Sequence, residues 1–295
     1  MKKIYLAPVA LLAFALFSTG CGNQRTPAPA ATADAAFRNF TSAIESNDPV
    51  AVWNFLPGSY QADVNGLLNE FAEKMDAQLW NAGTGTFKKV EEVLRTKKDL
   101  ILTSPMLEQV PGKEEIEANY GHLVNILGIL AKSDLMDLEK MKSADLGRIL
   151  STTGKQLIAE AEKMDVEAAK DIGGIADFRD MQSEMTNMKA ELISEEGDEA
   201  VVRITGDGDH DDEVEFVRVE GKWIPKDLAE EWPQMIADAR EGLQEIGQLS
   251  PQEKQQVMMG INMVNGVLDQ MLAAETHEDM QNVIAGVMGM MMGGF

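Results

Sequence analysis

The spacing of the apolar residues changes twice along the chain, and these changes limit the folds that it can adopt. Over residues 34–186, apolar residues recur three and four positions apart, which is typical of amphipathic helices. Over residues 187–225 they alternate with polar residues, which indicates strands, and helical spacing returns over residues 226–295. The sequence therefore predicts a single, predominantly helical α+β domain over residues 34–295, with one small antiparallel sheet at about residues 187–225.

Turn residues divide the alternating segment into four short strands. Residues 195–198 and 206–212 are rich in Gly, Asp and Glu, and Gly221-Lys222 follows the third alternating run directly. Strands joined by such short connections pair antiparallel with their neighbours in sequence. We therefore expect a β-meander packed with the helices that precede and follow it.

Two helix starts carry capping signals, and one helical stretch has no evident break. Asp48 precedes Pro49, and Ser250 precedes Pro251 with Glu253 in position for a capping box. A further run of apolar residues keeps helical spacing without interruption and predicts one continuous helix: Leu67, Leu68, Phe71, Met75 and Leu79.

The first 20 residues have the layout of a secretory signal peptide. Lys2 and Lys3 precede an apolar run over residues 4–17, which is followed by small residues. This run is too short to span about 30 Å of hydrocarbon as a permanent transmembrane helix. We expect residues 1–20 to direct export and to be removed.

The end of this segment, Ser18-Thr19-Gly20-Cys21, resembles the lipobox of bacterial lipoproteins, although Ser18 stands where that family usually has Leu. The resemblance implies cleavage before Cys21, lipid on its thiol and attachment to a membrane of the cell envelope. Gly22 is not the Asp that favours inner-membrane retention in such lipoproteins, so the resemblance favours the outer membrane. Residues 21–33 are rich in Pro and Ala and would form the tether.

The charge of the chain excludes one class of partner. Without Lys2 and Lys3, 24 basic residues stand against 49 acidic ones, a formal charge of −25. Nucleic-acid binding needs a dense basic patch, and the short basic clusters at 88–89 and 95–98 are interleaved with acidic residues. We therefore expect no nucleic-acid partner.

Two parts of the chain, residues 36–56 and residues 188–224, resemble the nuclear transport factor-like domains of small bacterial lipoproteins. The resemblance rests on an early helix pair and on strands that end in Gly221-Lys222-Trp223-Ile224. It implies a curved sheet with a helix-lined pocket. Domains of this type include enzymes, ligand binders and assembly modules, so the resemblance does not determine the function.

An acidic loop before the third strand is a candidate cation site. Asp207, Asp209, Asp211 and Glu213 supply the oxygen ligands that Ca²⁺ prefers. The spacing imitates the start of an EF-hand, but Asp212 stands where that loop requires Gly. Two interpretations remain open, a solvated hairpin turn and a weak divalent-cation site, and no other cofactor is expected.

The C-terminal part of the chain is rich in methionine. Met259, Met263 and Met271 fall on one helical stripe with Val267. Packing into the core is the simplest interpretation, and a partner-docking helix is the alternative, because Met side chains suit both irregular cores and adaptable binding surfaces. Thioether binding of Cu(I) is a third possibility, but no Cys or suitably placed His supports it.

The sequence gives little support for catalysis. It contains no Gly-x-Ser-x-Gly, Ser-x-x-Lys, His-Glu-x-x-His or Gly-x-x-x-x-Gly-Lys motif, and His122, His210 and His277 lie far apart. The resulting expectation is a lipid-anchored, non-catalytic envelope protein that binds a protein partner or a small ligand. A hydrolase with an unrecognised site and a weak cation-binding module are the alternatives.

The anchor prediction can be tested with one substitution. Cys21→Ala removes the thiol that would carry lipid, so the variant should leave the membrane fraction and be released by carbonate, whereas the wild-type protein should resist extraction. Immunoblots of fractionated cells measure the distribution. Carbonate-resistant membrane attachment of Cys21→Ala would show that the lipoprotein assignment is wrong.

Overall fold

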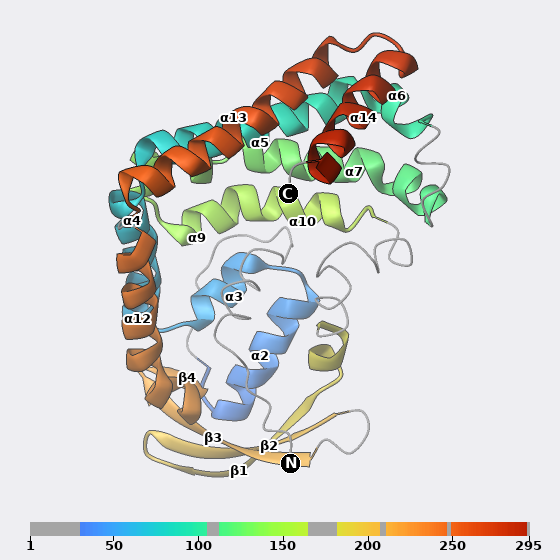
Figure 1. The fold of residues 1–295 in the computed structure, drawn as a ribbon. Helices are drawn as coiled ribbons and strands as arrows, with labels where there is room; N and C mark the ends of the chain where they lie inside the picture. The colour runs from blue at the N-terminus through green and yellow to red at the C-terminus, as the bar shows by residue number, and fades with distance from the viewer. Residues whose placement is uncertain (1–29, 105–111, 165–181, 207–210, 247–248, 294–295) are drawn as a thin grey trace.

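The computed structural model describes residues 30–104, 112–164, 182–206, 211–246 and 249–293. It confirms a predominantly helical α+β fold with one small antiparallel sheet (Figure 1). The elements, in chain order, are α2 (Ala33–Glu45), α3 (Pro49–Phe55), α4 (Gly58–Lys74), α5 (Ala77–Thr96), α6 (Lys98–Leu102), α7 (Lys113–Ala131), the 3₁₀ turn η2 (Asp134–Met136), α8 (Leu138–Met141), α9 (Leu146–Ile149), the π-helical turn η3 (Leu150–Gly154), α10 (Lys155–Ala161), β1 (Lys189–Glu196), β2 (Glu199–Thr205), β3 (Asp211–Val219), β4 (Lys222–Pro225), α12 (Lys226–Ile246), α13 (Pro251–Ala273) and α14 (His277–Gly293).

The sheet has the simple order β1-β2-β3-β4, so each strand pairs antiparallel with its neighbour in sequence, as the turn residues predict. Val202 of β2 faces Leu192 on β1 and Val214 on β3. A bulge between Leu192 and Ser194 shifts the register near the middle of edge strand β1.

Helix α2 covers one face of this sheet. Ala33, Ala36 and Phe37 on α2 pack against a buried set on the strands, comprising Ala200, Val202, Phe216 and Trp223. The alternation along β2 explains the contact, because residues two apart point to the same face. The side chains of α2 and the inward residues of the strands thus form one of the hydrophobic cores.

Figure 1 shows the sheet at one end of the molecule and a layer of helices at the other. Helices α4 and α12 run side by side and connect the two ends, while α5, α13 and α7 lie together in the distant layer. Among the described residues, no helix is both long and apolar enough to span a bilayer.

A second core lies where the connecting helices meet the sheet. Trp53 of α3, Ile224 of β4 and Trp232 of α12 are at least 94% buried and belong to one cluster. The Tyr60 ring of α4 stacks on Trp232 with centroids 4.1 Å apart. The indole N–H of Trp232 donates to Asp63 over 3.0 Å. These contacts attach α4 and α12 to each other beside the sheet.

The turn between β3 and β4 holds the corner between α3 and α4. Glu220 and Gly221 have φ values of 52° and 78°, the signature of a tight type I′ hairpin turn. The Glu220 carboxylate accepts the Ser59 N–H at the start of α4, and these bonds lower its pKa. The Lys222 ammonium donates to the carbonyls of Asn54 and Leu56, each over 2.7 Å, at the end of α3. Each charge therefore lies at the helix end that its sign favours.

The helix-start predictions at Asp48 and Ser250 are confirmed. The Asp48 carboxylate accepts the N–H of Val50 and Ala51, and Ser250 forms a complete capping box with Glu253. The prediction of one continuous helix through residues 67–79 is wrong. Helix α4 ends before Met75, and the Asp76 carboxylate caps a new helix by accepting the Leu79 N–H over 2.9 Å.

The contact of the β3–β4 turn with α3 gives a stability prediction. Lys222→Met should lower the free energy of unfolding by about 1–3 kcal/mol, because two helix-end carbonyls lose their charged donor. Urea denaturation monitored by circular dichroism measures the change. Lys226→Met, which removes only an ion pair with the largely exposed Glu215, should stay within about 1 kcal/mol of the wild type. Equal effects of the two changes would contradict the proposed role of Lys222.

Candidate functional site

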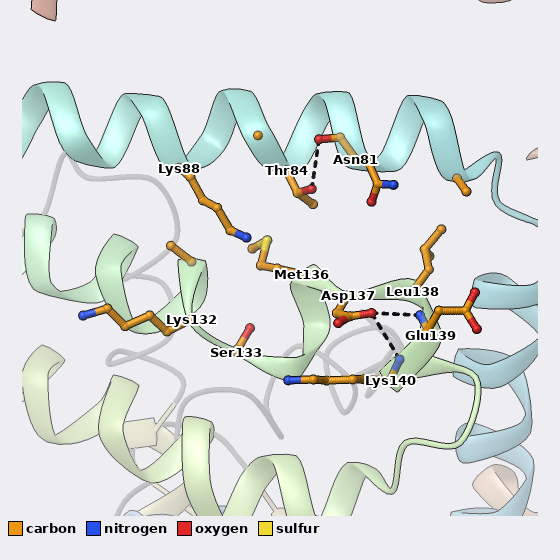
Figure 2. Close-up of a pocket in the computed structure, with 13 residues that line it drawn as sticks. Asn81, Thr84, Lys88, Lys132, Ser133, Met136, Asp137, Leu138, Glu139 and Lys140 are labelled. Carbon is orange, nitrogen blue, oxygen red and sulfur yellow. Dashed lines mark hydrogen bonds between the residues drawn. The ribbon is translucent and has the colours of Figure 1, made fainter.

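A cleft in the described part of the chain lies between α5 and residues 131–140 (Figure 2). Its volume is about 600 Å³, which is within the range of ligand pockets. The lining comprises Ala77, Asn81, Thr84, Gly85 and Lys88 on α5, with Ala131, Lys132, Ser133, Met136, Asp137, Leu138, Glu139 and Lys140 opposite.

Local sequence explains both walls of this cleft. The residues that α5 contributes lie on one helical face, and most are small, so they leave space beside the helix. The opposite wall turns sharply after α7. Ser133 donates its hydroxyl to the Leu130 carbonyl, and the Asp137 carboxylate caps α8 by accepting the N–H of Glu139 and Lys140 (Figure 2).

The charged side chains of the cleft differ in whether they have partners. Lys140 and Arg148 each donate to Asp134 over 2.9 Å, and these bonds lower the pKa of Asp134. Within the described ranges, no carboxylate forms an ion pair with Lys88 or Lys132. In Figure 2 the Lys88 side chain extends from α5 toward Met136, whereas the exposed Lys132 side chain extends away from Met136. The cleft thus offers one uncommitted ammonium group that points inward, that of Lys88, and a second lysine, Lys132, at its edge.

A second candidate surface lies on α13, the helix that packs on α5. Lys254 and Asp269 attach it there by pairing with Asp76 over 2.5 Å and with Lys89 over 2.6 Å. Leu268 is buried in the described structure. Elsewhere on the helix, apolar side chains are 44–60% exposed, and these residues define the α13 outer face: Met259 and Met263 on the side opposite Lys254, with Val257 and Val264 nearer to Leu268.

The structure separates the three methionines of the predicted stripe. Met259 and Met263 are 60% and 59% exposed, whereas Met271 is half-buried. The packing interpretation is therefore wrong for Met259 and Met263. The reason is that residues 255–268 contain no charged residue, so α13 is apolar on more than one side and its periodicity does not reveal which side packs.

The predicted cation-site residues fall partly outside the described ranges. Asp207 and Asp209 are not described, and neither are His210 and Cys21. Asp211 and Glu213 begin β3, where both carboxylates face Arg203, at 3.5 Å and 2.8 Å. No group of three or more His, Cys, Asp or Glu side chains within the described parts of the chain is placed to hold a metal ion.

Helices α7 and α10 share a polar cluster whose acidic member could not be identified from the sequence. The buried Glu160 carboxylate accepts hydrogen bonds from Lys163 and His122, both over 2.8 Å, and from Asn125 over 2.9 Å. These bonds lower the pKa of Glu160 from 4.5 to about 2. Because an ionised carboxylate can only accept, the His122 Nδ1 atom carries the proton in this bond. Three donors on one carboxylate make this cluster a link between helices.

The remaining described histidine also lies at a helix contact. His277, the first residue of α14, places Nε2 2.5 Å from the Thr103 hydroxyl after α6.

A signal for the Glu160 cluster was present in the sequence, since His122 and Asn125 are three residues apart on one helix. Nothing in the sequence, however, identified which distant acid they would meet.

The pKa of Glu160 predicts how stability depends on pH. A carboxyl group with a lowered folded-state pKa contributes stability above pH 4.5 that is lost as the pH falls toward about 2. Glu160→Gln should therefore be about 1–3 kcal/mol less stable than the wild type near neutral pH, and the difference should shrink at about pH 3. Urea unfolding at both pH values measures this.

Glu92→Gln is the matched control, because Glu92 is an exposed residue of α5. Its effect should be small at both pH values. A Glu160→Gln deficit that stays the same at low pH would contradict an ionised, hydrogen-bonded Glu160.

Comparison of the chain with protein-family models, with curated proteins and with solved structures finds no match in any of the three. No relative therefore supplies a role for the cleft, for the α13 outer face or for the Glu160 cluster.

Proposed function

We propose that this protein is a lipid-anchored, non-catalytic module of the cell envelope that binds a helical segment of a protein partner through the α13 outer face. The observation that carries the proposal is the exposure of Met259 and Met263, at 60% and 59%, on a helix whose other side already packs on α5. Apolar side chains grouped on one surface are characteristic of interaction sites.

The composition of α13 supports a docking role. Fourteen successive residues, 255–268, lack charge, in a chain whose formal charge is −23. Interface centres are depleted of charged residues and enriched in Met. Unbranched Met side chains also adapt to the shape of different apolar partners.

The chemistry of the partner follows from what surrounds this face. Exposed acidic residues flank it, including Glu253 at one end and Glu275 and Glu278 beyond the other. A complementary segment would present apolar side chains at helical spacing, with basic residues beside them. We therefore assign the α13 outer face to an amphipathic, basic helix of another envelope protein.

The location of the module rests on the sequence. The lipobox-like segment ending in Cys21 and the Pro/Ala-rich residues that follow support attachment to an envelope membrane, with the outer membrane favoured. The packing of α2 on the four-stranded sheet supports the resemblance to nuclear transport factor-like domains. The helices from α4 to α10 would be additions to that plan.

A membrane surface is a less suitable occupant of the α13 outer face. Anionic lipid headgroups attract basic segments and repel acidic ones. Residues 255–268 contain no Lys or Arg that could contact such headgroups. A protein helix that supplies its own basic residues complements the surroundings of this face better.

A model peptide tests the docking proposal. The probe is a fluorescent amphipathic helix made of Leu and Lys, titrated into the purified protein and followed by fluorescence anisotropy. Met259→Gln combined with Met263→Gln should weaken binding about tenfold, because two apolar contacts are lost. Ile193→Gln, a change at a 43% exposed apolar residue of β1, is the matched control and should leave binding unchanged.

Two outcomes would contradict the proposal. Unchanged binding by the double variant would show that the peptide binds through its charge alone. Cosedimentation with phosphatidylglycerol vesicles that depends on Met259 and Met263, without peptide binding, would assign the face to lipid instead.

A further inference from the structure

We propose that the cleft between α5 and residues 131–140 is a separate binding site for a small organic anion that carries a carboxylate or phosphate group. The cleft lies on the side of α5 that faces residues 131–140, while other α5 side chains, among them Lys89, contact α13. The site therefore does not depend on the partner proposed for α13.

The charge of the ligand follows from which charged side chains of the cleft already have partners. Both acidic residues of the lining already have partners, since Asp137 accepts two backbone N–H groups of α8 and Glu139 pairs with Lys142 over 2.6 Å. Within the described residues, Lys88 and Lys132 have no such partner. An incoming anion would thus meet the free ammonium group of Lys88 without competing with an existing ion pair, and Lys132 at the edge of the cleft would add a second positive charge nearby.

The order of the side chains along the cleft predicts the orientation of the bound ligand. In Figure 2, Lys88 and Lys132 lie toward one end, whereas Asn81 and Leu138 lie toward the other. Met136 lies between them and offers apolar contact. An anionic group at the lysine end would place the rest of the molecule against Met136 and Leu138, with the Asn81 amide available for a hydrogen bond.

The acidic surface of the protein limits the size of the ligand. A polyanion such as a nucleic acid would extend beyond the cleft and meet a chain with a formal charge of −23. A small anion is screened from charges farther away than about 8 Å at physiological ionic strength. The volume of about 600 Å³ accommodates a metabolite-sized molecule.

Titration calorimetry and thermal unfolding of the purified protein test this site. Succinate and phenyl phosphate are the carboxylate and phosphate probes, and succinamide and phenol are their uncharged counterparts. We expect at least one anion at millimolar concentration to release heat and raise Tm, and neither uncharged compound to do so. Lys88→Gln should weaken binding about fivefold to tenfold, whereas Lys98→Gln, at an exposed lysine of α6, should not.

A pair of glycine substitutions separates loss of binding from loss of folding. A Cβ at Gly85 or at Gly83 meets no atom within 4 Å, and only Gly85 lines the cleft. Both Gly85→Leu and Gly83→Leu should raise Tm, because Leu favours helix more than Gly does. Gly85→Leu should also weaken anion binding by occupying part of the cleft, while Gly83→Leu should retain it.

Three results would overturn the proposal. These are no heat and no Tm shift with either anion, equal binding by Lys88→Gln and the wild type, or undiminished binding by a folded Gly85→Leu variant. Stronger binding of succinate than of phenyl phosphate would identify a carboxylate ligand, and the reverse order a phosphate ligand.

Discussion

The tight turn between β3 and β4 is the constraint on which the rest of the structure depends. Its two central residues, Glu220 and Gly221, have positive φ, so the strands reverse without an intervening loop. This reversal places the Glu220 carboxylate at the start of α4 and the Lys222 ammonium at the end of α3. Burial lowers the pKa of Lys222, yet the two helix-end carbonyls that it contacts favour its charged form. The turn thereby fixes the direction in which α4 leaves the sheet.

The direction of α4 determines where both candidate sites lie. Helix α12 packs along α4 through the stacked Tyr60 and Trp232 rings, and α5 begins where α4 ends. At that junction one carboxylate, Asp76, caps α5 and also accepts the Lys254 ammonium of α13. This shared acid orients α13 against α5, which leaves the outer face of α13 exposed. The helical layer is therefore positioned by contacts that begin at the sheet.

Local signals in the sequence predicted much of the fold. The four strands and the caps at Asp48 and Ser250 depend on residues close together in the chain, and these predictions are confirmed. The break at Met75 was missed because apolar spacing continues through it to Leu79. Only the capping role of Asp76 marks the new helix, and Asp also occurs within helices.

The sites could not be predicted in the same way, because they depend on pairings between distant segments. The cleft forms where small residues of α5, such as Gly85, face the turn after α7, about fifty residues later. Glu160 and His122 are 38 residues apart in the sequence. For Met259 and Met263 the obstacle was different, since α13 lacks charge over residues 255–268 and only its contact with α5 decides which side remains exposed.

The exposed methionines and the free lysines both stand out because the rest of the protein surface is acidic. An acidic surface lowers non-specific association, because most soluble proteins, anionic lipids and nucleic acids are repelled by it. Two regions beside the paired helices α5 and α13 differ from that surface: one is neutral and apolar, and the other carries Lys88 and Lys132, while its acidic residues Asp137 and Glu139 already have partners. Selectivity at such places needs little direct recognition, because the surrounding charge rejects most competitors. The proposed lipid anchor would reinforce this, since tethering two proteins to one membrane raises their effective concentration and lets a contact of modest affinity suffice.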